Sequence, residues 1–167
     1  MILLCADKLG LDVPEDGSAA RTLEHLENSA RRMARMVEQL LDFSRLRTDG
    51  LSMQFGPCNL GEVAHSVVGE VAQANPHTPI ELRTEGDLDG DGDGDRLAQV
   101  VSNLVGNAVL HGGRHPVQVH LDGREHDTLR LSVRNTGHIP DTLMPRLFEP
   151  FKASFHASQG LGLGLFI

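Results

Sequence analysis

The amino-acid sequence predicts an α+β chain in which a helical hairpin is followed by a sandwich of helices and strands. Two observations carry this prediction. A heptad pattern of apolar residues runs through the first third of the chain, which is typical of helices that pack against other helices. After residue 50, segments with one apolar helical face are interspersed with short runs that alternate apolar and polar residues, as half-buried strands do.

Composition and charge limit the classes of function. The 167 residues suffice for one compact domain with an appendage, and the formal net charge is -8. Six acidic residues between Glu85 and Asp95 account for most of this charge, and no basic surplus suited to nucleic acid remains. Cys5 and Cys58 lack a CxxC spacing, which favours a reducing compartment, and no apolar run is long enough to span a membrane. We therefore expect a cytoplasmic segment without membrane contact.

The first third of the chain is predicted to be helical. Residues 2–9 resemble the end of one helix, stopped by Gly10. A second helix is expected from Ser18, a good N-cap, to about Arg47. Its seam residues recur at alternating spacings of three and four: Leu23, Leu26, Ala30, Met33, Val37, Leu40 and Ser44. Because a large apolar side chain gains roughly 1.5–3 kcal/mol on full burial, we expect a four-helix bundle with a second copy of the chain.

Three elements are predicted between residues 51 and 84. Residues 51–55 alternate like a short strand, and residues 79–84 form another. Between them, Asn59 and Glu62 make a variant of the capping box in front of a helix that ends before Asn75. The apolar face of this helix consists of Leu60, Val63, Ala64, Val67, Val68 and Val71.

The acidic segment DLDGDGDGD, residues 87–95, has two interpretations. Its alternating aspartates suggest a calcium-binding loop, but the glutamate that closes such a loop at the twelfth position is missing. The simpler interpretation is a solvated Gly/Asp turn that delivers Asp95 as the N-cap of the next helix.

The segment RLAQVVSNLVGNAVLH, residues 96–111, predicts a helix with an unusual polar face. Its apolar face consists of Leu97, Val100, Val101, Leu104, Val105 and Ala108. Beside this face, an amide column recurs at every fourth residue: Gln99, Asn103, Asn107 and His111. Asn is a mediocre helix former, whereas an amide oxygen suits a divalent cation that carries phosphates. Asn103 and Asn107 are therefore candidate ligands, and two solvated surface residues are the alternative.

The last third is predicted to contain a hairpin, a short helix and a glycine-rich end. Gly112 and Gly113 end the Asn helix, and residues 117–121 and 129–133 should form an antiparallel hairpin. Residues 143–151 should form a short helix and turn, and residues 152–159 a flexible loop. In the final GLGLGLFI, glycines let the backbone approach a ligand closely at the start of a buried helix.

Four motifs follow one another along the chain: the Asn helix, a strand ending in Asn135-x-Gly137, LFEPF at residues 147–151 and the terminal GLGLGL. In this order they resemble the N box, first glycine box, F box and second glycine box of the ATP-binding domain of sensor histidine kinases. The heptad helix resembles the second helix of that family's dimerisation and phosphotransfer domain. The resemblance implies partial dimerisation helices at residues 1–50 and a Bergerat-fold ATP-binding domain at residues 51–167, incomplete at its C-terminus.

The resemblance also implies a role for each matching residue. Asn107 would coordinate the Mg²⁺ that bridges the phosphates of ATP, and Asn103 would lie beside it as a second candidate ligand. In related ATPases such as gyrase, a Glu at the position of Asn103 activates water, which an amide cannot do. Asn135 would contact the adenine, and Gly137 would let the base approach. The other expected ATP-binding residues are His111, Phe148, Phe151, Lys152, Gly160, Leu161, Gly162, Leu163 and Gly164.

The sequence departs from this family's pattern at several places. Asn135 replaces an Asp, so the hydrogen bond to adenine loses its charge-assisted strength. His138 and Ile139 stand where the first glycine box would end, and Leu110 replaces a common Lys. The phosphoacceptor His box is absent, and His25 does not fit it, so no catalytic His is assigned and the 167 residues are not expected to phosphorylate themselves.

Three functions remain open on the sequence. The leading one is the ATP-binding catalytic part of a two-component sensor histidine kinase. Such a kinase is a homodimer through the heptad helix and transfers the γ-phosphoryl group to a His and then to a response regulator receiver domain. The alternative is a degenerate dimerisation or scaffold module that binds no nucleotide. A serine kinase of the anti-sigma type is a third, which the heptad helix disfavours.

Overall fold

The computed structural model describes residues 53–151 and 162–166, together with residues 22, 26, 29–30, 33–34 and 36–44. The chain divides into two compact units, Ser52–Pro145 and a second unit that combines Met1–Leu51 with Arg146–Ile167. The helix end predicted at residues 2–9 and the loop predicted at residues 152–159 lie outside the described residues.

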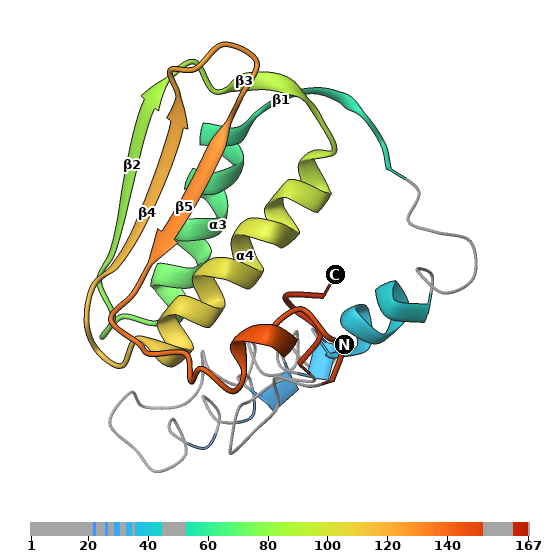
Figure 1. The fold of residues 1–167 in the computed structure, drawn as a ribbon, viewed down its shortest axis with the longest axis vertical. Coiled ribbons are helices and arrows are strands. Elements are labelled where there is room, and N and C mark those ends of the chain that lie inside the picture. The colour runs from blue at the N-terminus through green and yellow to red at the C-terminus, as the bar shows by residue number, and fades with distance from the viewer. Residues whose placement is uncertain are drawn as a thin grey trace. The chain divides into compact units, whose positions relative to one another are not determined.

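The unit Ser52–Pro145 contains a three-stranded sheet with two helices on one face (Figure 1). Strand β2 (Ile80–Gly86) pairs in parallel with β4 (Val117–Gly123), and β4 pairs antiparallel with β5 (Arg130–Arg134). The order in the sheet is therefore β2-β4-β5. The predicted hairpin and the strand predicted at residues 79–84 are confirmed, the latter with two more residues at its end.

The two helices, α3 (Leu60–Ala74) and α4 (Gly94–His111), begin at side-chain caps. The predicted cap of α3 is confirmed, because Asn59 Oδ1 accepts the backbone N–H of Glu62 at 3.0 Å. The prediction that Asp95 caps α4 was wrong. The cap is Asp93, whose Oδ1 accepts the N–H of Arg96 at 3.2 Å. At its other end, α4 stops at Gly112, as predicted.

The acidic segment forms part of a second, two-stranded sheet. Strand β3 (Asp89–Gly92) pairs antiparallel with β1 (Gly56–Asn59). The predicted turn is therefore a strand, but its exposure to solvent is as predicted, since Asp89, Gly90 and Asp91 are exposed. The strand predicted at residues 51–55 was wrong, because 53–55 are not in a strand and 51–52 are not described. Asp and Gly have low strand propensity, which the pairing with β1 overrides. This pairing keeps the backbone extended up to Asp93, which explains why Asp93 rather than Asp95 is the cap.

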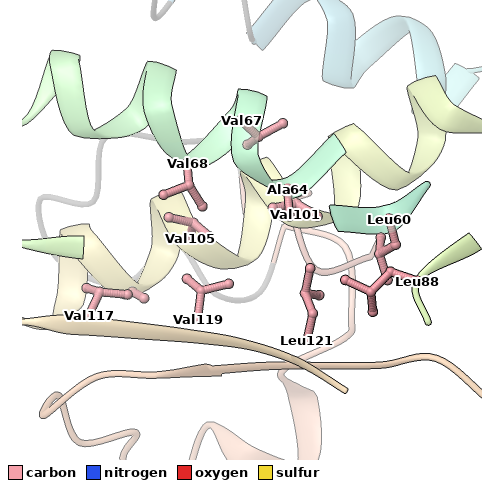
Figure 2. Close-up of a cluster of buried hydrophobic side chains, with 11 residues drawn as sticks. Leu60, Ala64, Val67, Val68, Leu88, Val101, Val105, Val117, Val119 and Leu121 are labelled. Atoms are coloured by element: carbon pink, nitrogen blue, oxygen red, sulfur yellow. The ribbon is translucent and has the colours of Figure 1, made fainter. Parts of the chain in front are cut away.

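The core lies between the helices and the inner face of the sheet (Figure 2). Alternate residues of β4 point into it, and Val117 and Leu121 are fully buried there against Val101 and Val105 of α4. The predicted core faces of α3 and α4 are confirmed in large part. Val100 is an exception, since 44% of it is exposed. At 3.6 residues per turn it lies on the same side of α4 as Asn103 and Asn107.

In the other unit, the described residues between 22 and 44 are helical, in agreement with the predicted heptad helix. Its small seam residue Ala30 is buried, but the large apolar seam residues are between 46% and 59% exposed within one chain: Leu26, Met33, Val37 and Leu40. An apolar seam that one chain leaves exposed is suited to a partner helix.

Candidate functional site

The amide column on α4 contains two side chains that make no hydrogen bond within the described part of the chain. Asn103 and Asn107 lie one turn apart on the helix, and both are half-buried. Gln99, one turn earlier, differs because its Oε1 accepts a hydrogen bond from Arg96 Nη1 at 2.8 Å. Because neither side chain uses its donors and acceptor within the described residues, both amides are open to a ligand.

Two apolar side chains flank this pair and were missed as site candidates. Val100 and Leu110 are 44% and 45% exposed on the face of α4 that carries the two amides. The apolar periodicity of the helix predicts that Val100 lies in the core, and Leu110 stands out in the sequence only as the replacement of a Lys. Their angular position on the helix could have identified both. Apolar groups around a few convergent polar groups are typical of a ligand-binding surface.

The corner formed by residues 135–137 packs against the C-terminal end of α4. Thr136 Oγ1 donates a hydrogen bond to the Gly112 carbonyl at 3.2 Å. Gly137 lies so close to the His111 carbonyl that a Cβ at residue 137 would be 2.3 Å from the oxygen. Asn135 is half-buried beside Gly112 and Gly137, and its amide also has no partner in the described residues. The structure thus brings Asn135 and Gly137 to the His111 end of the amide column.

The predicted site residues after Pro145, which include the two phenylalanines and the terminal glycines, belong to the other unit. The short helix predicted at residues 143–151 is a single 3₁₀ turn, η1 (Met144–Arg146), followed by turns. Phe148 and Phe151 are both exposed, and the backbone N–H of Phe151 donates to the Gly162 carbonyl at 3.1 Å. Phe43 of the heptad helix, which the sequence analysis did not single out, packs edge to face on Phe151 with ring centres 5.0 Å apart.

The glycine-rich end forms turns in its described residues, 162–166, so the helix predicted to start there is not present in them. Gly162 has a φ of +69°, a conformation that L side chains rarely adopt, and Leu163 is fully buried. Gly164 is half-buried. Lys152, Gly160 and Leu161 lie outside the described residues.

Asp93 connects the start of α4 to the segment that enters the first strand. Besides capping α4, its carboxylate accepts the backbone N–H of Gln54 through Oδ2 at 2.7 Å. The bond from Gln54 and the bond from Arg96 favour the charged form, so the pKa of Asp93 lies below its usual value. The entry segment is therefore tied to the helix that carries the two amides.

The outer face of the sheet carries a separate cluster of charges. Arg124 contacts Glu85 at 2.7 Å and Asp122 at 2.6 Å, and the hydrogen bonds from Arg124 hold the pKa of the Asp122 carboxyl well below its usual range. A hollow of about 250 Å³ lies on the outer face of the sheet, and another of about 820 Å³ lies beside α3 and β2. No residue of α4 lines either hollow. Among the described residues, no three His, Cys, Asp or Glu side chains are grouped to hold a metal ion, and no helix has the length and hydropathy of a membrane span.

Comparison with known sequences assigns the region around α4 to a family. Residues 92–167 match the family described as "Histidine kinase-, DNA gyrase B-, and HSP90-like ATPase". A bacteriophytochrome of Pseudomonas aeruginosa is 38% identical in an alignment 161 positions long that covers 90% of this chain and 22% of the relative. The sensor protein kinase PmrB of the same organism is 34% identical in an alignment 160 positions long that covers 90% of this chain and 32% of the relative. The chain thus spans 22% and 32% of the length of these two curated relatives.

Solved structures agree with this assignment. The catalytic domain of the histidine kinase ThkA is 29% identical with a TM-score of 0.57, and the match covers 68% of this chain and 79% of that one. The complex of ThkA with the response regulator protein TrrA matches at 24% identity with a TM-score of 0.61, over 88% of this chain and 44% of that one, and supports the fold alone. From the ordered motifs, the α+β fold and these likenesses, we conclude that the chain is a homologue of the sensor histidine kinases and carries their ATPase domain.

Proposed function

We propose that this chain binds ATP together with Mg²⁺ and serves as the catalytic part of a two-component sensor histidine kinase. The ATPase domain implies ATP binding, whereas Mg²⁺ and the individual residues are proposals. The observation that carries them is the pair of half-buried amides, Asn103 and Asn107, which have no partner in the described residues. Both lie within the segment that matches the ATPase family.

The donor set fits Mg²⁺. This ion binds oxygen ligands, keeps several waters, and commonly takes one or two protein ligands together with substrate phosphates. Asn107 is proposed as the protein ligand, with Asn103 one turn away as the second candidate. When bound, the nucleotide supplies the γ-phosphoryl group and the ion neutralises phosphate charge. Neither amide can accept a proton as a general base, so the pair positions ATP without activating water for hydrolysis.

The remaining proposed contacts divide between the two ends of the nucleotide. Asn135 contacts the base at the His111 end of the column, and Gly137 lets the corner that carries Asn135 pack closely on the His111 carbonyl. Gly162 and Gly164 offer backbone N–H groups to the phosphates. Phe148 and Phe151 flank the segment that covers the nucleotide. The same role in nucleotide binding is proposed for Lys152, Gly160, Leu161 and Leu163.

The activity of the whole kinase is proposed from its relatives. Residues 1–50 belong to the dimerisation helices and residues 51–167 to the catalytic domain, and two chains associate through the exposed seam of the heptad helix. In the parent protein, the γ-phosphoryl group passes to a His and then to the receiver domain of a response regulator. ThkA, a histidine kinase with a similar fold, was solved in complex with a response regulator protein, and we propose a partner of this class here. The cytoplasm, where ATP and such regulators meet, is the proposed location.

Titration of the chain with a fluorescent ATP analogue tests the proposal. Saturable binding is expected with Mg²⁺, with displacement by unlabelled ATP and a clear loss of affinity on chelation of the ion. A scaffold that has lost its nucleotide site would show no saturable signal in either condition. That result, from a chain whose circular dichroism shows it to be folded, would overturn the proposal.

A further inference from the structure

We infer that Asn135 makes the nucleotide site tolerant of 6-oxo purines, so that inosine and guanosine triphosphates bind about as well as ATP. The inference rests on the proposed function and deepens it by naming the class of nucleotide that the site accepts. It concerns the corner at residues 135–137, which the structure describes fully.

The Asn135 amide is held in place by its backbone but not by a hydrogen bond of its own. Its residue sits between Gly112 and Gly137, and the Thr136 hydroxyl fixes the corner by donating to the Gly112 carbonyl. The Asn135 side chain is half-buried and has no hydrogen-bond partner among the described residues. No described interaction therefore prevents the amide from turning over and exchanging the positions of its oxygen and its NH₂ group.

The chemistry of the side chain then decides which purines are accepted. A carboxylate only accepts hydrogen bonds, so beside position 6 of the base it favours the amino group of adenine and repels the oxygen of hypoxanthine or guanine. An amide offers both an acceptor and a donor. Asn135 can accept from an amino group through Oδ1 or donate to a 6-oxo group through Nδ2. An Asp would discriminate between the two kinds of base, and the Asn found here would not.

Competition binding tests this directly. ATP, inosine triphosphate and guanosine triphosphate each displace a fluorescent ATP analogue from the parent chain, from Asn135→Asp and from Gln73→Glu. Inosine triphosphate is the decisive probe because its base differs from adenine in the amino-to-oxo exchange and the accompanying proton on N1, and lacks the 2-amino group of guanine. Gln73→Glu adds the same charge at an exposed position on α3, away from the corner.

For the parent chain we expect inosine triphosphate and ATP to bind within about threefold of each other, because the amide can satisfy either base. For Asn135→Asp we expect a preference for ATP of about tenfold or more, and for Gln73→Glu the ratio of the parent. The inference is overturned if the parent chain already binds ATP tenfold more tightly than inosine triphosphate. It is also overturned if the ratio of these two affinities is the same in Asn135→Asp as in the parent chain. Failure of the parent chain to bind ATP at all would instead refute the proposed function, and the inference with it.

Discussion

At the residue scale, the candidate nucleotide site is recognised by polar side chains that have no hydrogen-bond partner within the described part of the chain. Gln99 and Asp93 make hydrogen bonds within the chain and are explained by the structure alone. Asn103, Asn107 and Asn135 are half-buried and have no partner in the described residues. Among the described residues, none of these amide atoms is fully buried, so each amide is open to a ligand, and three of them along one helix and its end indicate a ligand-binding role.

Gly137→Ala tests whether the corner must pack tightly on α4. The new Cβ would lie 2.3 Å from the His111 carbonyl oxygen, so the backbone of one of the two segments must move. We expect a lower thermal midpoint and at least about tenfold weaker nucleotide binding, since positioning at a site is sensitive to shifts of about 1 Å. Circular dichroism and the fluorescent titration measure these two effects.

Gly69→Ala is the matched control, because a Cβ there meets nothing within 4 Å and the residue lies inside α3. Alanine in a helix interior should raise stability by about 0.5–1 kcal/mol and leave binding unchanged. If Gly137→Ala behaves like Gly69→Ala, the described packing of the corner has no role in the site.

At the element scale, the sequence predicted those helices and strands whose own residues show a clear apolar periodicity. The helical periods of α3 and α4 and the alternation in β4 and β5 appear in the structure close to their predicted places. Strands β1 and β3 were missed because Gly, Pro and Asp give no strand signal, and their pairing joins residues 30 to 36 positions apart. The displacement of the helix cap from Asp95 to Asp93 follows from the same pairing.

Asp93→Asn tests the tie between the entry segment and α4. The pKa of Asp93 is lowered in the folded chain, so its carboxylate stabilises the fold at pH values above the unfolded pKa of about 3.9. That contribution is lost as the pH falls through the lower, folded pKa. We therefore expect Asp93→Asn to unfold at a lower urea concentration than the parent at pH 7, with a difference that shrinks below about pH 4.

Asp95→Asn is the control, because Asp95 is exposed and does not cap the helix. Urea midpoints between pH 3 and pH 7 compare the three chains. A difference in urea midpoint between the parent and Asp93→Asn that is independent of pH would show that the charge of Asp93 does not contribute to holding the Gln54 segment on α4.

At the scale of the whole molecule, the motif residues are distributed over both compact units of the chain. Asn103, Asn107, Asn135 and Gly137 fall in Ser52–Pro145, where the corner after β5 packs on the end of α4. Phe148, Phe151, Gly162 and Gly164 fall in the other unit. The order of the motifs predicted that both groups serve one nucleotide, an expectation that the periodicity of single elements could not provide.

Val37→Glu tests the proposed dimer. Val37 is a seam residue of the heptad helix and is 55% exposed in the single chain. A charge buried at a helix–helix seam is costly, so we expect dimer dissociation to become at least about tenfold easier in sedimentation equilibrium. Gln39→Glu adds the same charge two residues later, outside the seam, and should leave the dimer intact. A parent chain that stays monomeric at high concentration would contradict the dimer.

The most direct test of the account is the Mg²⁺-dependent affinity of Asn107→Ala for the ATP analogue. Removing the proposed ligand of the ion should weaken binding at least about tenfold in the presence of Mg²⁺ and have little effect in its absence. Gln73→Ala, which removes an exposed amide from α3, should bind like the parent chain. Equal affinities of the parent chain and Asn107→Ala with Mg²⁺ present would contradict the central claim that the amides of α4 hold the metal–nucleotide complex.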